Sequence, residues 1–159
     1  MKLISGGVCA AQGFKANGIH CGIRRNHSKK DLALIVSQVP AAAAAVYTTN
    51  LVKGAPLTVT KNNIANGMAQ AVICNSGNAN TCNANGIEIA EAMSVLVAKA
   101  MNIDASDVIV ASTGVIGQPL SIDPIAAGMG ELAEGLSMNG GQAAAEAIMT
   151  TDTVMKEVA

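Results

Sequence analysis

Residues 112–117 (STGVIG) hold the residue types best suited to chemistry, after an apolar run and before a helical pattern. Binding sites in α/β proteins gather at the carboxyl ends of strands. Gly114 lets a backbone N–H approach a ligand closely, and the Thr113 hydroxyl can donate beside it. Two such donors form an oxyanion hole for an acyl-transfer intermediate. A phosphate-binding turn is an equal functional alternative, although Gly-x-x-Gly without a following Lys is weak evidence. Local spacing alone favours a plain strand-end turn.

Two other polar segments are residues 75–80 (NSGNAN) and 150–153 (TTDT). Composition alone favours a strand-to-helix connection for the first, because Gly and Asn suit tight turns. The functional alternative is that its amides orient a neighbouring polar site. A Thr/Asp cluster after a helix is most often a cap or a turn. The hydroxyls from Thr150 onward can also bind a polar substrate.

The side chains that usually act as nucleophiles or bases form no recognisable set. His20 stands in an apolar stretch that predicts a structural role, and His27 stands in a basic, solvated loop. The four cysteines lack the spacing of a metal site, so we expect reduced thiols and no metal. No Ser/His/Asp set, Walker loop or dinucleotide fingerprint is present. The residues therefore offer half of an acyl-transfer site and no nucleophile.

Strands are predicted early in the chain and helices late. Ile89, Met93 and Val97 recur at helical spacing. Asp123 as the N-cap, with Pro124 at the first helical position, indicates the start of a second helix. The predicted class is α/β or α+β, with helices packed on a sheet in a single domain over residues 1–159. The expected strands cover residues 31–39, 42–49, 56–60, 70–74 and 108–111, and the expected helices cover 89–101, a segment beginning at 123, and 141–149.

The amino-acid composition excludes some classes of binding partner. Hydrophobic residues make up 50% of the 159 residues, aromatic residues 1% and charged residues 13%, with a net charge of −1. These values argue against nucleic-acid binding. The longest apolar run, residues 41–47, is too short for a membrane span, and the opening residues 1–7 lack the apolar core of a signal peptide. We expect a cytoplasmic protein that buries part of its thinly charged surface against another chain.

The chain resembles the ornithine acetyltransferases, also called bifunctional glutamate N-acetyltransferases. No single segment is decisive, but six in the same order are highly specific. These are residues 13–16 with 18–23, 30–35, 46–50 with 55–56, 75–80, 112–117 and 149–153. The resemblance implies transfer of acetyl from N-acetylornithine to glutamate in arginine biosynthesis, without a cofactor. Some members of the family also use acetyl-CoA as the donor.

The family also implies a self-cleaving precursor that yields α and β chains and assembles as a heterotetramer of two α and two β chains. The N-terminal Thr of the β chain is the nucleophile, and its own amino group can act as the base. Thr113 and Gly114 match the family's oxyanion-hole pair, and Thr150 matches a substrate-binding threonine. The implied fold is that of the self-processing acetyltransferases and aminopeptidases, which is similar to the N-terminal-nucleophile hydrolases.

One departure places the nucleophile outside this chain. In the family, self-cleavage occurs beyond the Thr-Thr-Asp-Thr stretch, after a segment that has no counterpart here, so we expect that Ala159 is not the processing point. The chain is then an N-terminal portion of the α chain and inactive alone. Residues 81–86 differ from the family pattern, and no role is assigned to Cys82. Two alternatives are a self-processing aminopeptidase and a non-catalytic fragment. We expect Thr113→Val and Gly114→Ala variants of the full-length protein to fold.

Overall fold

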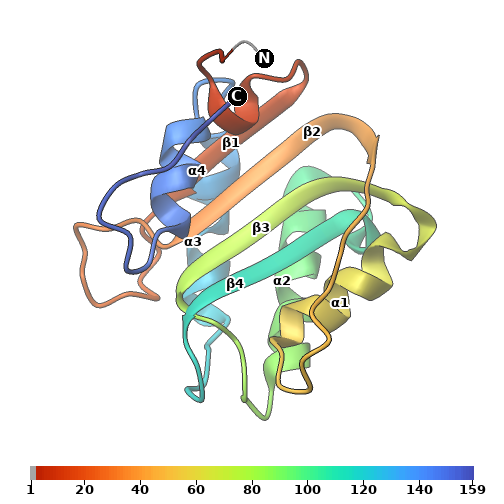
Figure 1. The fold of residues 1–159 in the computed structure, drawn as a ribbon, viewed down its shortest axis with the longest axis vertical. Coiled ribbons are helices and arrows are strands. Elements are labelled where there is room, and N and C mark those ends of the chain that lie inside the picture. The colour runs from red at the N-terminus through yellow and green to blue at the C-terminus, as the bar shows by residue number, and fades with distance from the viewer. Residues whose placement is uncertain (1–2) are drawn as a thin grey trace.

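The centre of the molecule is a four-stranded mixed sheet with strand order β1-β2-β3-β4. The computed structural model describes residues 3–159, so Met1 and Lys2 of the opening segment lie outside the described residues. The first three strands are antiparallel neighbours, whereas β4 runs parallel to β3. The strands are β1 (Phe14–Ile19), β2 (Leu32–Ala42), β3 (Met68–Asn78) and β4 (Val108–Val115) (Figure 1).

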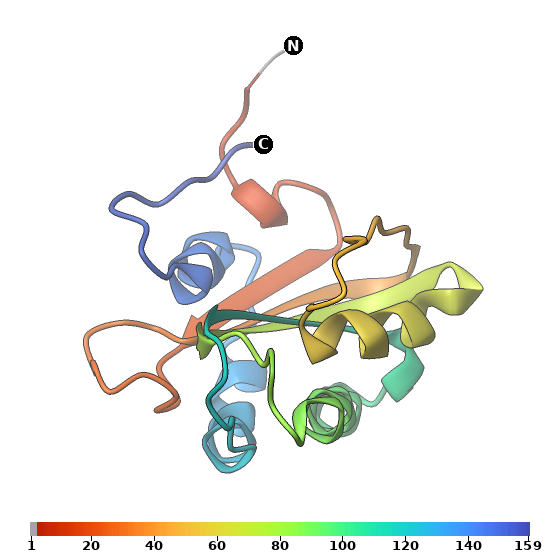
Figure 2. The same cartoon turned by 60° about the horizontal axis from the view of Figure 1, so that its bottom comes forward.

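Helices cover the two faces of the sheet unequally, as Figure 2 shows. Helices α2 (Gly86–Met101) and α3 (Asp123–Glu134) lie on one side, where alternate strand residues such as Leu34 and Ile73 are fully buried. Helix α4 (Gly141–Ile148) lies on the other side, against β1 and β2, through small buried residues that include Ala16 and Ala144. Short 3₁₀ turns occur at Gly7–Cys9, Ile64–Asn66 and Ala105–Asp107.

Helix α1 (Ala55–Asn63) closes the edge of the sheet at β4. The Thr60 hydroxyl donates to the Val110 carbonyl at 2.8 Å and accepts the Val110 N–H at 2.9 Å. The Asn63 amide donates to the Val108 carbonyl at 2.8 Å. At the opposite edge, Ala16 and Ser137 exchange two backbone hydrogen bonds, of 3.0 and 3.1 Å. Backbone groups of both outer strands are thus paired by side chains or by a loop.

The predicted α+β class, with helices packed on a sheet, is confirmed. The strands expected at 31–39, 70–74 and 108–111 are present, and so are the three expected helices. Asp123 is the first residue of α3 and not its cap, and its N–H donates to the Ser121 hydroxyl at 3.1 Å. Among residues 3–159, no helix has the length and apolar character needed to span a membrane.

Two of the predicted strands are wrong. The strand expected at 42–49 is absent beyond Ala42, because β2 ends where its partner β3 begins, at the pair Ala42 and Met68. Residues 56–60 belong to α1, in which Pro56 occupies the first turn and Val59 and Thr60 are buried. Packing of this face against β4 overrides the strand propensity of its Val and Thr residues.

Candidate active site

Thr113 and Gly114 lie at the carboxyl end of β4, where they pair in register with Ser76 and Gly77 of β3. Gly114 has a φ of +134°, and a Cβ added there would lie 2.4 Å from the Gly77 carbonyl carbon. Only glycine allows this approach of the two strands. Thr113 is half-buried and Gly114 is exposed, so both of the residues expected to supply donors reach the surface at this end of the sheet.

Buried amides fix this end of the sheet. Asn75 is fully buried, accepts the Ser112 hydroxyl at 2.6 Å and donates to the Asn78 carbonyl at 2.9 Å. Asn78 donates to the Gln118 carbonyl at 3.0 Å, and its own amide oxygen accepts the Asn80 N–H at 2.7 Å. These contacts support the alternative that residues 75–80 orient a polar site. Composition alone favoured a plain connection, because it does not show that these amides are buried.

Thr150 follows α4 and is half-buried. Its N–H donates to the Asp152 carboxylate at 3.3 Å, so the Thr/Asp cluster forms a local turn. The hydrogen bond from Lys156 lowers the pKa of Asp152. Two residues bring this segment to the end of β3: Ser76 donates to the Ala147 carbonyl at 2.5 Å, and Arg24 donates to the Met149 carbonyl. Thr150 therefore lies on the same end of the sheet as Thr113 and Gly114.

Asp31 is a fully buried carboxylate that the sequence analysis did not single out. It accepts the backbone N–H groups of Cys21 at 2.7 Å and Arg24 at 2.9 Å, and His20 Nδ1 lies 3.2 Å away. The sequence did contain one signal for a buried carboxylate, a single acidic residue at the start of an otherwise apolar predicted strand. His20 Nδ1 also lies 2.9 Å from the Lys29 carbonyl, which agrees with the structural role expected for His20. His27 is exposed, as expected.

The cysteine thiols are free, and burial raises the pKa of three of them. Burial, reinforced by Asp31, raises the pKa of Cys21 to about 12, and burial raises that of Cys74 to about 11. These two thiols stay protonated at neutral pH and are poor nucleophiles. Within residues 3–159, no cluster of three or more His, Cys, Asp or Glu side chains is arranged to hold a metal ion.

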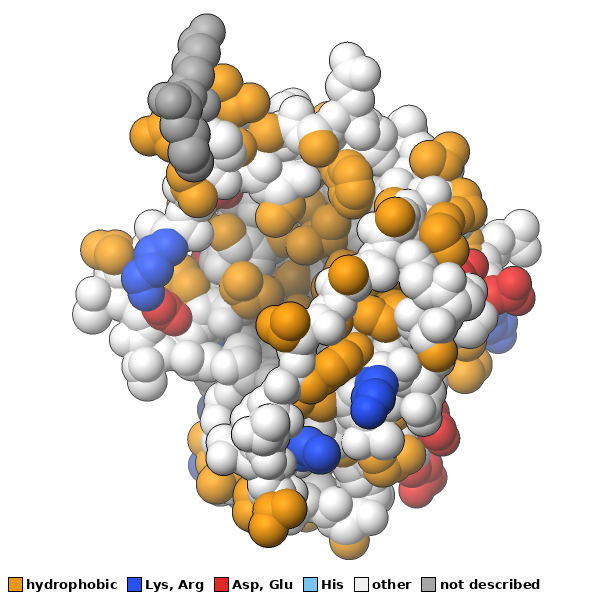
Figure 3. Space-filling view, turned by 45° about the vertical axis from the view of Figure 1, so that its right-hand side comes forward, with side chains coloured by type: hydrophobic (Ala, Val, Ile, Leu, Met, Phe, Trp, Pro, Cys, Tyr) orange, Lys and Arg blue, Asp and Glu red, His pale blue; other side chains and the backbone are white. Residues whose placement is uncertain are grey.

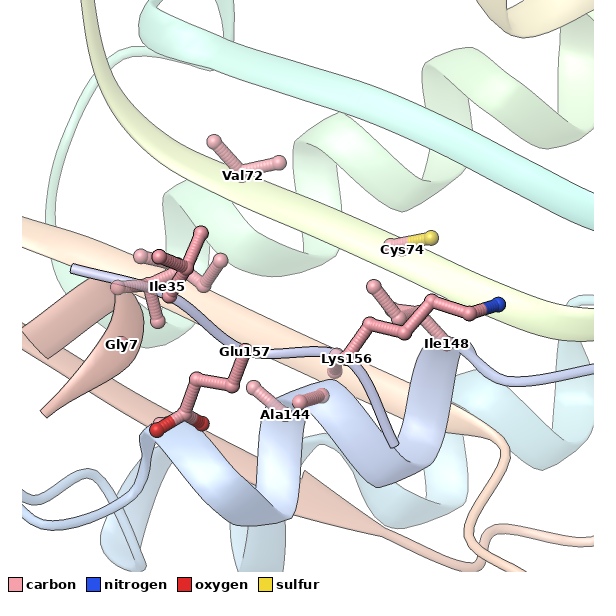
Figure 4. A pocket seen from close by; sticks show the side chains of 13 residues that line it. Gly7, Ile35, Val72, Cys74, Ala144, Ile148, Lys156 and Glu157 are labelled. Carbon is pink, nitrogen blue, oxygen red and sulfur yellow. The ribbon is translucent and has the colours of Figure 1, made fainter. Parts of the chain in front are cut away.

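A cavity of about 270 Å³ adjoins the carboxyl-terminal part of β4. Its polar lining residues are Tyr47, Thr60, Thr81 and Ser112. The Tyr47 hydroxyl is buried and has no hydrogen-bond partner among the described residues. A second pocket, of about 260 Å³, lies between α4 and the sheet. Figure 4 shows its side chains: Val72 and Cys74 come from β3, and Ile148 comes from α4. The lining of this second pocket is mostly apolar, although Lys156 and Glu157 also line it, and it does not include Thr113 or Gly114.

The face of the sheet beside α4 remains partly uncovered. We define the apolar sheet face as the half-buried side chains Ile35, Val72, Cys74, Ile109 and Ala111. The pocket at α4 continues into a neighbouring hollow of about 250 Å³, because Ile35 and Val72 line both. Hydrophobic side chains gather in a hollow on this side of the molecule (Figure 3). No helix of the described chain covers β3 and β4 on this face, as Figures 1 and 2 show.

Known proteins resemble the chain along its whole length. An arginine biosynthesis bifunctional protein ArgJ from Symbiobacterium thermophilum is 50% identical over 161 residues, and one from Gloeobacter violaceus is 48% identical over 158. These alignments cover 100% and 98% of this chain but only 40% and 39% of the relatives. The chain thus spans about two fifths of the length of these curated relatives.

Two crystal structures share the fold. The ArgJ protein of Bacillus halodurans has a TM-score of 0.90 and 44% identity, covering 99% of this chain and 83% of that one. Ornithine acetyltransferase from Mycobacterium tuberculosis, solved with ornithine, has a TM-score of 0.92 and 40% identity, covering 99% and 86%. A sequence model of the ArgJ family matches residues 15–159. The chain belongs to the ArgJ family.

Proposed function

We propose that the chain supplies the oxyanion hole and a substrate-binding threonine of an acetyltransferase that moves acetyl from N-acetylornithine to glutamate. The proposal is supported chiefly by the carboxyl end of β4, where close packing against Gly77 requires glycine at Gly114, next in sequence to the Thr113 hydroxyl. Family membership supports the assignment, and a relative with the same fold is named an ornithine acetyltransferase.

In this mechanism the nucleophile is a threonine outside the chain. Its hydroxyl attacks the acetyl carbonyl, and the oxygen that becomes negative accepts hydrogen bonds from Gly114 N–H and the Thr113 hydroxyl. The amino group of that threonine takes the hydroxyl proton and passes it to the nitrogen of the breaking amide bond, so ornithine leaves as the amine and acetyl remains esterified to the threonine. The amino group of glutamate then attacks the ester and regenerates the enzyme, which gives ping-pong kinetics. The Thr150 hydroxyl binds the amino-acid substrate. Acetyl-CoA is an alternative donor, and the reaction uses no resident cofactor or metal.

The proposal includes a β chain of the same precursor as the partner, in a cytoplasmic heterotetramer of two α and two β chains. The apolar sheet face supports a protein partner. Ile35, Val72 and Ile109 are only half-buried in the chain itself, and a partner that packs on them would remove this apolar surface from water. A net charge of −1 gives no support to a nucleic-acid partner. The proposal includes no membrane partner.

The test replaces Thr113 in protein expressed from the complete gene. Thr113→Val keeps the shape of the side chain and removes the hydroxyl donor, so we expect kcat to fall by about 10²–10³, as for other oxyanion donors. Thr113→Ser keeps the hydroxyl and should retain most of the turnover. Near-normal turnover in the Val variant would show that Thr113 is not an oxyanion donor. Gly114→Ala is a poorer probe than the sequence suggested, because its Cβ must displace the backbone of β3.

The same assay separates transfer from hydrolysis. Consumption of N-acetylornithine should depend on glutamate, and N-acetylglutamate should form in equal amount. A hydrolase of similar fold would release acetate at the same rate without glutamate. An inactive but fully assembled protein would support a non-catalytic role.

A further inference from the structure

Two side chains tie the end of α4 and the residue after it to the end of β3. The Ser76 hydroxyl donates to the Ala147 carbonyl at 2.5 Å, and the Arg24 Nη2 donates to the Met149 carbonyl. In the β3–β4 register, Ser76 pairs with Thr113 and Gly77 pairs with Gly114. The two ties therefore act beside the strand positions that carry the proposed oxyanion hole.

The structure holds Arg24 in place from two sides. Its N–H donates to the buried Asp31 carboxylate at 2.9 Å. Its side chain lies on the backbone of β3, because a Cβ added at Gly77 would lie 2.9 Å from Arg24 Cγ. The Arg24 Nε is buried and has no hydrogen-bond partner among residues 3–159. Nε is thus shielded from water, and Nη2 makes the described contact with the Met149 carbonyl, one residue before Thr150.

We propose that Arg24 is a positioning residue that holds Thr150 at the oxyanion end of the sheet. The inference rests on the proposed function for the role of Thr150. Arginine suits this task because its planar guanidinium donates in fixed directions, whereas lysine carries a compact charge on a flexible stem. Arg24 acts through the Met149 carbonyl and is assigned no contact with substrate.

The kinetic test compares neighbouring arginines in protein expressed from the complete gene. Arg24→Met keeps an unbranched stem of similar length and removes the tie, so KM for N-acetylornithine should rise about tenfold or more. Arg25 is exposed, and Arg25→Met should change KM by less than about twofold. Arg24→Lys should fold and recover part of the loss. Equal effects of the Arg24→Met and Arg25→Met variants would overturn the proposal.

A double-mutant cycle tests whether Arg24 acts through Thr150. In a Thr150→Ala background, Arg24→Met should add little further loss, because the hydroxyl that it positions is already absent. Fully multiplicative effects would show that Arg24 acts elsewhere. A purely structural role predicts that Arg24→Met lowers activity by the same factor in both backgrounds.

Hydrogen exchange separates this inference from the proposed function. Amides 149–152 should exchange faster in Arg24→Met than in Arg25→Met, while the amides of β3 and α2 keep their protection. Unchanged exchange at 149–152 would overturn the tie itself. Faster exchange at 149–152 together with normal kinetics of Thr150→Ala would show that Arg24 holds this segment but that Thr150 does not bind substrate. The positioning role of Arg24 would then also be rejected.

Discussion

Cys74 illustrates how burial controls chemistry at single residues. Its thiol faces the apolar pocket beside α4, and desolvation raises its pKa from 9.0 to about 11. A thiolate is the reactive form, so the thiolate fraction below pH 9 is about a hundredfold smaller than for an unperturbed thiol. Since the folded-state pKa is the higher one, the associated stability is present below pH 9 and is lost as the pH rises towards 11.

Alkylation with iodoacetamide should reveal this shift. At pH 8, Cys74 should react far more slowly than the exposed Cys82, and its rate should rise about tenfold per pH unit until the pH approaches 11. Mass spectrometry of the peptides measures both rates in one sample. Protein unfolded in urea is the control, in which the two cysteines should react alike. Equal rates at pH 8 in the folded protein would contradict the prediction.

At the same scale, the sequence indicated the types of site residue better than their contacts. Thr113 and Gly114 were candidates because a Thr-Gly pair follows an apolar run, but local spacing alone favoured a plain turn, and the family resemblance supplied their expected role. The role of Arg24 could not be predicted, because its partner Met149 is distant in sequence. The partners of Asp31, such as the Arg24 N–H, are near in sequence, but they depend on a loop conformation that composition does not reveal. The amides of Asn75 and Asn78 were visible as a pattern, but only their burial shows that they orient the strand end.

Among the elements, α1 shows how a helix can protect an exposed strand. β4 has a neighbouring strand on one side only, and unpaired edge groups invite unwanted pairing. Thr60 satisfies both the N–H and the carbonyl of Val110, at 2.9 and 2.8 Å. Asn63 adds a bond to the Val108 carbonyl. The polar face of α1 thus stands where a fifth strand would otherwise pair.

Replacing Thr60 should destabilise the protein, because Thr60 pairs the outer edge of β4. Thr60→Val keeps the volume but leaves the buried backbone groups of Val110 without a partner, so the free energy of unfolding should fall by about 1–3 kcal/mol. Thr58→Val, on the exposed side of the same helix, is the matched control and should change it by less than about 0.5 kcal/mol. Urea denaturation measures both. Similar losses in the two variants would show that the edge contact is not stabilising.

Elements with local signals were predictable, and those set by partners were not. Pro124 and the spacing of Ile125, Met129 and Leu132 indicate α3 without knowledge of the fold. By contrast, residues 56–60 have strand-like composition and become helical through packing on β4. Residues 42–49 also have strand propensity, but the partner strand offers no residue to pair beyond Ala42, which lies opposite Met68. Strand existence depends on a neighbour, which composition does not reveal.

The whole molecule presents one face that its own helices leave partly uncovered. The apolar sheet face and its two connected hollows lie beside α4, and the charged fraction of the chain is only 13%. Exposed apolar surface of this kind favours association. The low charged fraction of the sequence therefore corresponds in part to one surface of the structure, the apolar sheet face on β2, β3 and β4.

The 159-residue chain by itself should self-associate through this face. Sedimentation velocity should show species larger than a monomer, with a fraction that grows with concentration. Ile109→Lys places a charge on the apolar sheet face and should shift the chain towards monomer. Val95→Lys, on an exposed position of α2 across the sheet, is the control and should leave association unchanged. A clean monomer of the unaltered chain would contradict the prediction.

The paired edges of the sheet determine how far such association can grow. Strand addition at an open edge leaves a new open edge, so it propagates into fibrils. Here α1 bonds to the outer edge of β4, and the loop at Ser137 pairs with the outer edge of β1 at Ala16. Stacking of two apolar sheet faces consumes the surface that drives it and ends at a closed pair. The chain is therefore built for finite assembly, in which burial of one face terminates growth.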